Sequence, residues 1–277
     1  MSAASRPSYV VQALRPWRCA LQHRHLLRRL LNRDIQVRYR GTMLGPIWTA
    51  LAPLAMLAVY TGIFGFLIKP QWQSDVAKPL FIPFVYFSGL ILFDFSFEGA
   101  TRAANLIREN RNYIKKVIVP VEILAWVVLL SSAFRLMISI GLMMVFYVVL
   151  IGIPPMASLI APFLILPLAL LTLGVVWLVS AAAVYVRDVG PFLAVCGPIL
   201  MFLTPVFYPL TAVPEELRIV FYLNPMTFPI EAVRGALFYD FWPNPPALLT
   251  YWVISILVCW AGYSLFMKLR PGFADVL

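Results

Sequence analysis

The feature that most constrains this chain is a succession of apolar blocks, each long enough to cross a lipid bilayer as a helix. A helical span needs about 20 mostly apolar residues. Six blocks reach that length, at residues 46–68, 80–104, 121–150, 157–185, 189–210 and 247–267. Because 62% of the 277 residues are hydrophobic, against about 45–50% in a typical soluble domain, the sequence predicts an all-α integral membrane protein with six transmembrane helices.

The 22 Lys and Arg residues are distributed unevenly among the segments that connect these blocks. Nine precede the first block, and four lie in LIRENRNYIKKVIVP at 106–120. Lys and Arg next to spans favour the cytoplasmic side of a membrane, so the pattern predicts a multi-pass protein with both termini cytoplasmic. The net charge of +10 then reflects orientation, and nucleic-acid binding is the less favoured interpretation.

The segment before the first block alternates apolar and basic residues. Leu26, Leu27 and Leu30 fall at helical spacing, and Arg28 and Arg29 lie between them. This pattern predicts an amphipathic helix in the membrane interface, and a solvated basic arm is the alternative. We therefore expect residues 1–45 to form a cytoplasmic interface segment and 46–277 the transmembrane domain.

The stretch from 205 to 246 contains too many Pro residues for one continuous span. It carries two short apolar pieces, LRIVFYL and MTFPIEAVRGALFY. Pieces of this length are typical of interfacial or re-entrant segments, which occur where protein or a water-filled cavity satisfies the backbone. We expect re-entrant outer helices at about 213–240, and an ordinary outer loop is the alternative.

The sequence lacks the motifs on which an enzyme of this size would depend. It contains no G-x-x-x-x-G-K-[ST] phosphate loop. Its two histidines, His23 and His25, both lie in the basic arm and make only a weak metal-site candidate. We expect no catalytic residue, no metal ligand and no cofactor bound by this chain.

Charged residues also lie well inside the second and third apolar blocks: Asp94, Glu98, Arg102 and Arg135. Charges inside spans are costly and often functional. Glu98 and Arg102 have the order that favours an ion pair within one helix, and Arg135 needs an acidic partner, for which Asp94 and Glu98 are available. These charges form either a structural ion pair between helices or the polar lining of a conduit, and a proton relay is the less favoured function because one Arg and two acids neutralise one another.

Three stretches resemble the permease subunits of ABC-2 type polysaccharide exporters, and most closely the O-antigen type. The first carries Arg38, Tyr39, Leu44, Gly45 and Trp48; the second Asn105, Leu106, Ile107, Lys115, Lys116, Pro120 and Glu122; the third Arg187-Asp188, Thr204-Pro205-Val206, Asn224-Pro225 and Arg234. Two departures are Thr204, where Ser is common, and Val121, where Arg is frequent.

The resemblance implies several sets of functional residues. The channel lining would comprise Tyr39, Trp48, Tyr60, Phe202, Phe207 and Tyr208. The contact with an ATPase would comprise Arg108, Asn110, Arg111, Tyr113, Lys115, Lys116 and Pro120. The lipid phosphate would be held by Arg28, Arg29, Arg38 and Arg40. The outer gate would comprise Pro214, Asn224, Pro225 and Arg234.

The resemblance also implies a mechanism and partners. Two copies of the permease would pair with two copies of a separate ATPase, which binds ATP and Mg²⁺. An undecaprenyl-diphosphate-linked polysaccharide would then cross the bacterial inner membrane between the permease copies. The alternatives are a self-contained secondary transporter or channel, which usually has internal repeats, and a membrane-embedded transferase acting on lipid-linked sugars.

Overall fold

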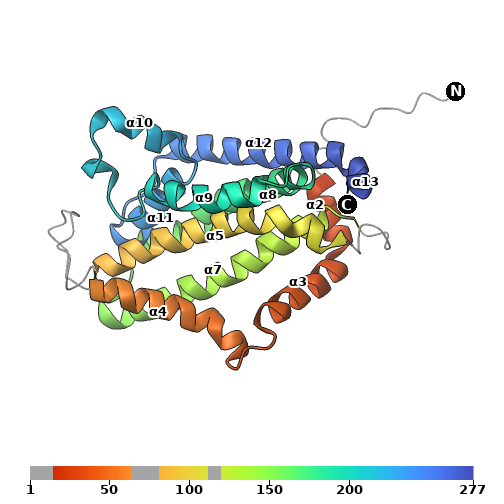
Figure 1. Ribbon diagram of the computed structural model, residues 1–277. Helices are drawn as coiled ribbons and strands as arrows, with labels where there is room; N and C mark the ends of the chain where they lie inside the picture. The colour runs from red at the N-terminus through yellow and green to blue at the C-terminus, as the bar shows by residue number, and fades with distance from the viewer. Residues whose placement is uncertain (1–14, 64–80, 112–119, 277) are drawn as a thin grey trace.

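The computed structural model describes residues 15–63, 81–111 and 120–276 (Figure 1). Within these ranges all regular structure is helical, which confirms the all-α prediction. Short 3-10 turns at Gly45–Ile47, Met156–Ile160 (η3), Leu210–Ala212 and Arg270–Gly272 connect or extend the α-helices.

Four helices are long and apolar enough to cross a membrane. They are α5 (Ile82–Glu109), α7 (Ile123–Leu150), α8 (Ala161–Tyr185) and α12 (Pro245–Leu269). They correspond to the second, third, fourth and sixth predicted blocks. The helices of the first and fifth blocks, α4 (Trp48–Gly62) and α9 (Val189–Phe202), have 15 and 14 residues, fewer than the roughly 20 that a straight span needs.

The predicted fifth span was too long at its C-terminal end. We expected it to reach residue 210, but α9 ends at Phe202. Pro205 has no N–H with which to continue the helix, and its carbonyl accepts a hydrogen bond from the distant side chain of Arg234. Residues 64–68 of the first predicted span lie outside the described residues.

The most extensive contact between described helices joins α8 and α12, and two glycines permit it. A Cβ at Gly174 would lie 2.6 Å from the Val258 carbonyl oxygen, and a Cβ at Gly262 would collide with the Gly174 carbonyl. Small residues let helix backbones approach closely in membrane proteins. α5 is the central helix, since it contacts α4, α7, α8, α9 and α11.

The connecting helices gather at the two ends of the molecule (Figure 1). One end carries α2 (Arg15–Gln22), α3 (Arg24–Tyr39) and α13 (Phe273–Val276), and the other carries α10 (Glu215–Leu223) and α11 (Thr227–Phe238). The two short apolar pieces predicted between 213 and 240 are therefore helices, α10 and α11. That they enter a membrane stays a prediction.

The basic N-terminal segment forms two helices where we expected one. α3 is amphipathic as predicted: Leu30 is buried, whereas Arg28 and Arg29 are exposed. However, Leu30 belongs to the protein core and α3 packs against α7. Part of the apolar face that we assigned to lipid thus covers another helix, because α7 offers an apolar surface at that end.

Candidate functional site

A polar stripe runs along α5, a helix that is otherwise buried. Among residues 82–104, Asp94 is the one exposed side chain, whereas Glu98 and Thr101 are half-buried and Asn105 beyond them is exposed. Spacings of three and four residues place these side chains on one helix face. α4 and α9 both pack against α5, and the side chains of the stripe nevertheless stay fully or partly exposed.

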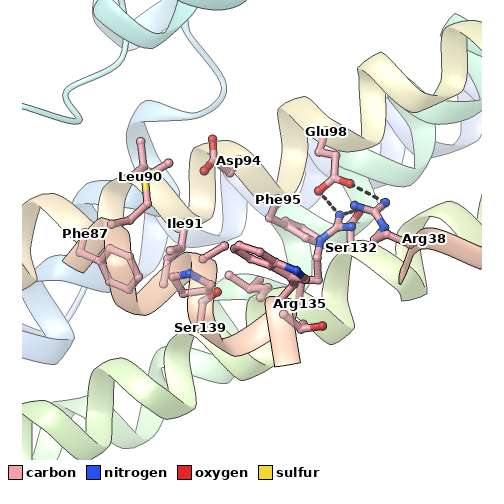
Figure 2. Close-up of a pocket in the computed structure, with 16 residues that line it drawn as sticks. Arg38, Phe87, Leu90, Ile91, Asp94, Phe95, Glu98, Ser132, Arg135 and Ser139 are labelled. Carbon is pink, nitrogen blue, oxygen red and sulfur yellow. Dashed lines mark hydrogen bonds and ion pairs between the residues drawn. The ribbon is translucent and has the colours of Figure 1, made fainter. Parts of the chain in front are cut away.

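A pocket of about 380 Å³ lies where α4, α5 and α7 meet (Figure 2). Trp48 and Pro53 of α4 close one side of the pocket, and its charged and polar lining comprises Arg38, Thr49, Asp94, Glu98, Ser132, Arg135 and Ser139. The pocket combines two guanidinium groups and two carboxylates with apolar side chains. It can therefore hold a polar group within an apolar protein.

Glu98 is the centre of an ion-pair network in this pocket. Its carboxylate accepts hydrogen bonds or ion pairs from Arg38, at 2.8 Å, and from Arg135 (Figure 2). The predicted acidic partner of Arg135 is thus confirmed as Glu98. Asp94 lines the same pocket, and its side chain points away from the two arginines in Figure 2.

The predicted ion pair between Glu98 and Arg102 is wrong. Arg102 instead donates to Asp34 of α3 at 2.5 Å. The pairs Arg38–Glu98 and Asp34–Arg102 lie four residues apart on both helices, so they join one face of α3 to one face of α5. Tertiary packing brought a closer partner to each side chain than the neighbouring helical turn offered.

Of the four arginines expected to hold the lipid phosphate, one belongs to this ion-pair network and three do not. Arg38 is committed to Glu98, so in this conformation its charge is neutralised within the protein and not by phosphate. Arg28, Arg29 and Arg40 are exposed at the end of the molecule that carries α3. Their contact with phosphate stays a prediction.

Three of the predicted channel residues form one aromatic cluster. The centroid of the Phe207 ring lies 6.1 Å from the ring centroid of Tyr60 (α4), 6.1 Å from that of Phe202 (α9) and 6.2 Å from that of Tyr86 (α5). The cluster therefore joins α4, α5 and α9 near the ends of these helices that face α10 and α11. Tyr86 is the member that we did not include among the channel residues.

The other predicted channel residues lie elsewhere. Trp48 borders the α4–α5–α7 pocket. Tyr208 contacts Phe221 of α10, 5.9 Å between ring centroids, and its hydroxyl donates to the Phe202 carbonyl. The side chain of Tyr39 lies outside the described residues. Of the five whose side chains are described, four lie toward the end that carries α10 and α11, and Trp48 lies apart from them at the pocket.

Arg234 joins several segments at the end of the molecule that carries α10 and α11. Its side chain is 1% exposed, and it donates to the carbonyls of Val85 at 2.9 Å, Val206 at 2.5 Å and Pro205. A Cβ at Gly89 would collide with the guanidinium group, which explains the glycine at that position of α5. We expected a gate residue here, and the geometry is that of a rigid clamp.

Asn224 makes a second connection to the same turn. Its side-chain amide donates to Leu203 O at 3.0 Å and to Thr204 Oγ1 at 2.8 Å. Pro214 immediately precedes α10, and Pro225 is exposed between α10 and α11. The Thr-Pro-Val and Asn-Pro segments are therefore joined by hydrogen bonds. One of them is accepted by the Thr204 hydroxyl, a group that a serine at this position would also provide.

The segment expected to contact an ATPase is described in part. Arg108 donates to the Ala183 carbonyl at 2.6 Å, and Asn110 accepts from Arg33 at 3.5 Å. Arg111 is exposed and Pro120 is half-buried before α7. Tyr113, Lys115 and Lys116 lie outside the described residues.

One ionic contact was missed by sequence reasoning. Glu122, buried before the start of α7, pairs with Arg270 at 3.0 Å and accepts from the Cys19 thiol at 3.7 Å. Burial and the Glu122 carboxylate raise the pKa of Cys19 to about 12. The contact joins both ends of the chain to α7, and an acidic residue at the start of an apolar block was the available signal.

The fold and the site define a multi-pass membrane protein with a polar feature at the centre of its helices. The described residues hold no group of three or more His, Cys, Asp or Glu side chains that could bind a metal. The chain belongs to the ABC-2 type transporter family, whose family model matches residues 25–238. It is thus a membrane subunit of a transporter.

Curated relatives are similar over nearly their whole length. An O-antigen export system permease protein RfbA from Myxococcus xanthus is 27% identical over 92% of this chain and 96% of its own. Two proteins of the same name from Klebsiella pneumoniae are 25% and 23% identical, each over 90% of this chain and 93% of its own.

Proposed function

We propose that this chain is the permease subunit of an ATP-driven exporter that moves a lipid-linked polysaccharide of the O-antigen type. The movement would run from the cytoplasm across the bacterial inner membrane. The names of the curated relatives support the substrate class. The observation that carries the proposal is the polar stripe on α5.

The stripe needs an aqueous or polar surrounding. A charged side chain at the centre of a bilayer costs several kcal/mol unless it faces protein or water. Asp94 is exposed near the middle of α5, in the pocket that α5 shares with α4 and α7. A path between two copies of the chain would supply that surrounding, and the rings of Tyr60, Phe202 and Phe207 would contact sugar faces at its outer end.

The driving force would come from a partner. The sequence has no phosphate-loop motif, so two copies of an ATPase would bind ATP and Mg²⁺ and act on the segment at 106–120. Arg108 and Asn110 are anchored to α8 and α3, and movement of that segment would therefore reach both helices. Arg28, Arg29 and Arg40 would attract the diphosphate of the undecaprenyl carrier, because guanidinium groups suit phosphate.

A cysteine-accessibility experiment tests the path. Asp94 and Leu257 are both exposed, at the middle of α5 and of α12 respectively. In a variant whose three native cysteines are replaced by serine, Asp94→Cys should react with a water-soluble thiol reagent, whereas Leu257→Cys should not. Equal labelling of both positions, or of neither, would contradict an aqueous path along α5.

A cellular assay tests the substrate and the energy source. Cells that lack this chain should accumulate the lipid-linked polysaccharide in the cytoplasm, and co-expression of the chain with its ATPase should restore polysaccharide at the cell surface. Restoration without the ATPase would instead favour a self-contained transporter.

A further inference from the structure

The outer end of the molecule holds a second and larger pocket, of about 1100 Å³. Its lining residues come from α10, α11 and adjoining segments, and these two helices lie at one end of the molecule (Figure 1). The segment 209–212, Tyr222 of α10, the outward face of α11 and the loop 239–244 form its walls. It shares no described lining residue with the α4–α5–α7 pocket.

The sequence of α11 produces two different faces. Ile230, Val233 and Leu237 are buried against the spans. Phe228, Glu231 and Gly235 recur at the same helical spacing on the pocket side. The helix therefore presents an aromatic ring and a carboxylate to the pocket while its apolar face fixes it to the bundle.

The polar groups of the pocket include one carboxylate with remaining capacity to accept hydrogen bonds. Glu231 Oε1 lies 3.6 Å from Arg234 Nη1, and its side chain is 34% exposed. The guanidinium of Arg234 is occupied by three backbone carbonyls, and Glu231 Oε1 is buried without a hydrogen bond from the described residues. Because Oε1 is buried beside Arg234, the accessible carboxylate oxygen is Oε2, and its acceptor sites remain for a ligand.

Aromatic faces dominate the remaining wall. Phe228, Tyr239 and Phe241 line the pocket with Tyr222, and three of these four are exposed, at 67% for Tyr222, 38% for Tyr239 and 64% for Phe241. Exposed rings beside a carboxylate, Thr211 and Asn244 suit a ligand with apolar C–H faces and many hydroxyl groups. A saccharide has that chemistry, whereas a phosphate would be repelled by Glu231.

The walls of the pocket are fixed before any ligand arrives. Arg218 donates to the carbonyls of Val213 at 2.9 Å and Thr211 at 3.3 Å, which ties α10 to the segment 209–212. Asp240 accepts from the Ala157 N–H at 3.0 Å, and Phe241 N donates to Gly235 O at 3.0 Å. Preformed walls are typical of ligand pockets.

We propose that this outer pocket is a saccharide-binding subsite, in which Glu231 accepts hydrogen bonds from sugar hydroxyls and Tyr222 and Phe241 contact sugar faces. The subsite would hold the emerging glycan on the far side of the membrane from the α3 end. The proposal rests on the proposed function for the identity of its ligand. It adds a second, fixed contact point beyond the aromatic cluster around Phe207.

The test measures binding directly, without transport. The full-length protein in lipid nanodiscs is titrated with short glycan fragments, free of lipid, that mild acid releases from the producing cell's surface polysaccharide, and heat is recorded by calorimetry. We expect saturable binding that weakens about tenfold in Glu231→Gln, since a hydrogen bond to a charged group contributes about that much. Phe241→Ala should weaken binding to a similar extent.

Two matched controls accompany these variants. Glu216→Gln removes an equally charged, exposed side chain from α10 outside the pocket, and Phe192→Ala removes an exposed ring from α9; both should leave binding unchanged. Absence of saturable binding to the wild-type protein, or equal binding by Glu231→Gln and Glu216→Gln, overturns the subsite. The export assay in cells decides the proposed function separately. If the wild-type protein exports polysaccharide but does not bind the fragments, the subsite is refuted and the proposed function stands. If the wild-type protein binds the fragments but does not export polysaccharide, the proposed function is refuted and the subsite stands.

Discussion

At the scale of single residues, the same kind of side chain has different roles according to its tertiary partners. Arg135 and Arg38 neutralise one carboxylate within the bundle, Glu98. Arg234 has backbone carbonyls as its principal partners. A buried arginine that serves carbonyls of two separated segments fixes their relative position, because each unsatisfied carbonyl would cost about 1–3 kcal/mol.

Replacement of Arg234 by methionine should therefore destabilise the protein by about 3 kcal/mol or more, because it leaves the buried carbonyls of Pro205 and Val206 without the guanidinium donor. Thermal unfolding of the purified protein in detergent measures the effect. Arg234→Lys should recover only part of the loss, since one ammonium group cannot match the planar fork. Arg218→Met on α10, at a partly exposed site, is the control and should cost about 1 kcal/mol or less. Equal effects at the two positions would contradict the clamp.

At the scale of elements, close backbone approach decides which helices pair. α8 and α12 meet where Gly174 and Gly262 face each other, and neither backbone leaves room for a Cβ. Lipid tails are as apolar as the helix surfaces, so the hydrophobic effect does little to bring two helices together in a membrane. Close van der Waals packing therefore supplies much of the free energy of helix association. α7, by contrast, carries Gly141, where an added Cβ would meet no described atom within 4 Å outside its own helix backbone.

Gly262→Ala should separate α8 from α12 and destabilise the protein by about 1–3 kcal/mol, as overpacking of a close contact does. Gly141→Ala adds the same methyl group to a helix of similar length and should be neutral or slightly stabilising, because alanine has the higher helix propensity. The unfolding temperatures of the two variants in the same detergent provide the comparison. A lower unfolding temperature for Gly141→Ala than for Gly262→Ala would refute the assignment.

At the scale of the whole molecule, the two ends differ in their exposed basic residues. α3 and the C-terminal turn carry exposed or partly exposed basic residues at one end (Figure 1). α10 and α11 lie at the other end, where Arg218 and Arg234 are held by carbonyls. This separation is the one that the Lys and Arg bias predicts for a membrane protein.

Opposite sidedness of the two ends can be measured by labelling. In the background without native cysteines, Leu223→Cys at the end of α10 should react with an impermeant maleimide on cells whose outer membrane is permeabilised. Asn32→Cys on α3, which is also exposed, should react only after the inner membrane is opened. Labelling of both positions from the same side would contradict the predicted orientation.

Sequence reasoning located most elements but few contacts. Apolar runs predicted the positions of α5, α7, α8 and α12. A helix in lipid makes its backbone hydrogen bonds within itself and needs a long run of apolar side chains, so it can be located from local composition. The end of α9 was misplaced by several residues, since it depends on Pro205 together with the distant Arg234. The pair Glu98–Arg102 was wrong for a similar reason: helical spacing made it available, but α3 brought Asp34 and Arg38 closer.

The sequence by itself determined the class of the molecule, its helical content and the clustering of its basic residues, because those follow from composition and local periodicity. Only the tertiary structure decided which charges pair, which aromatic rings meet around Phe207, and that α11 and the loop 239–244 enclose a pocket. Each of these joins segments far apart in the chain, and the choice among several acceptable partners is made by packing, which no local pattern encodes.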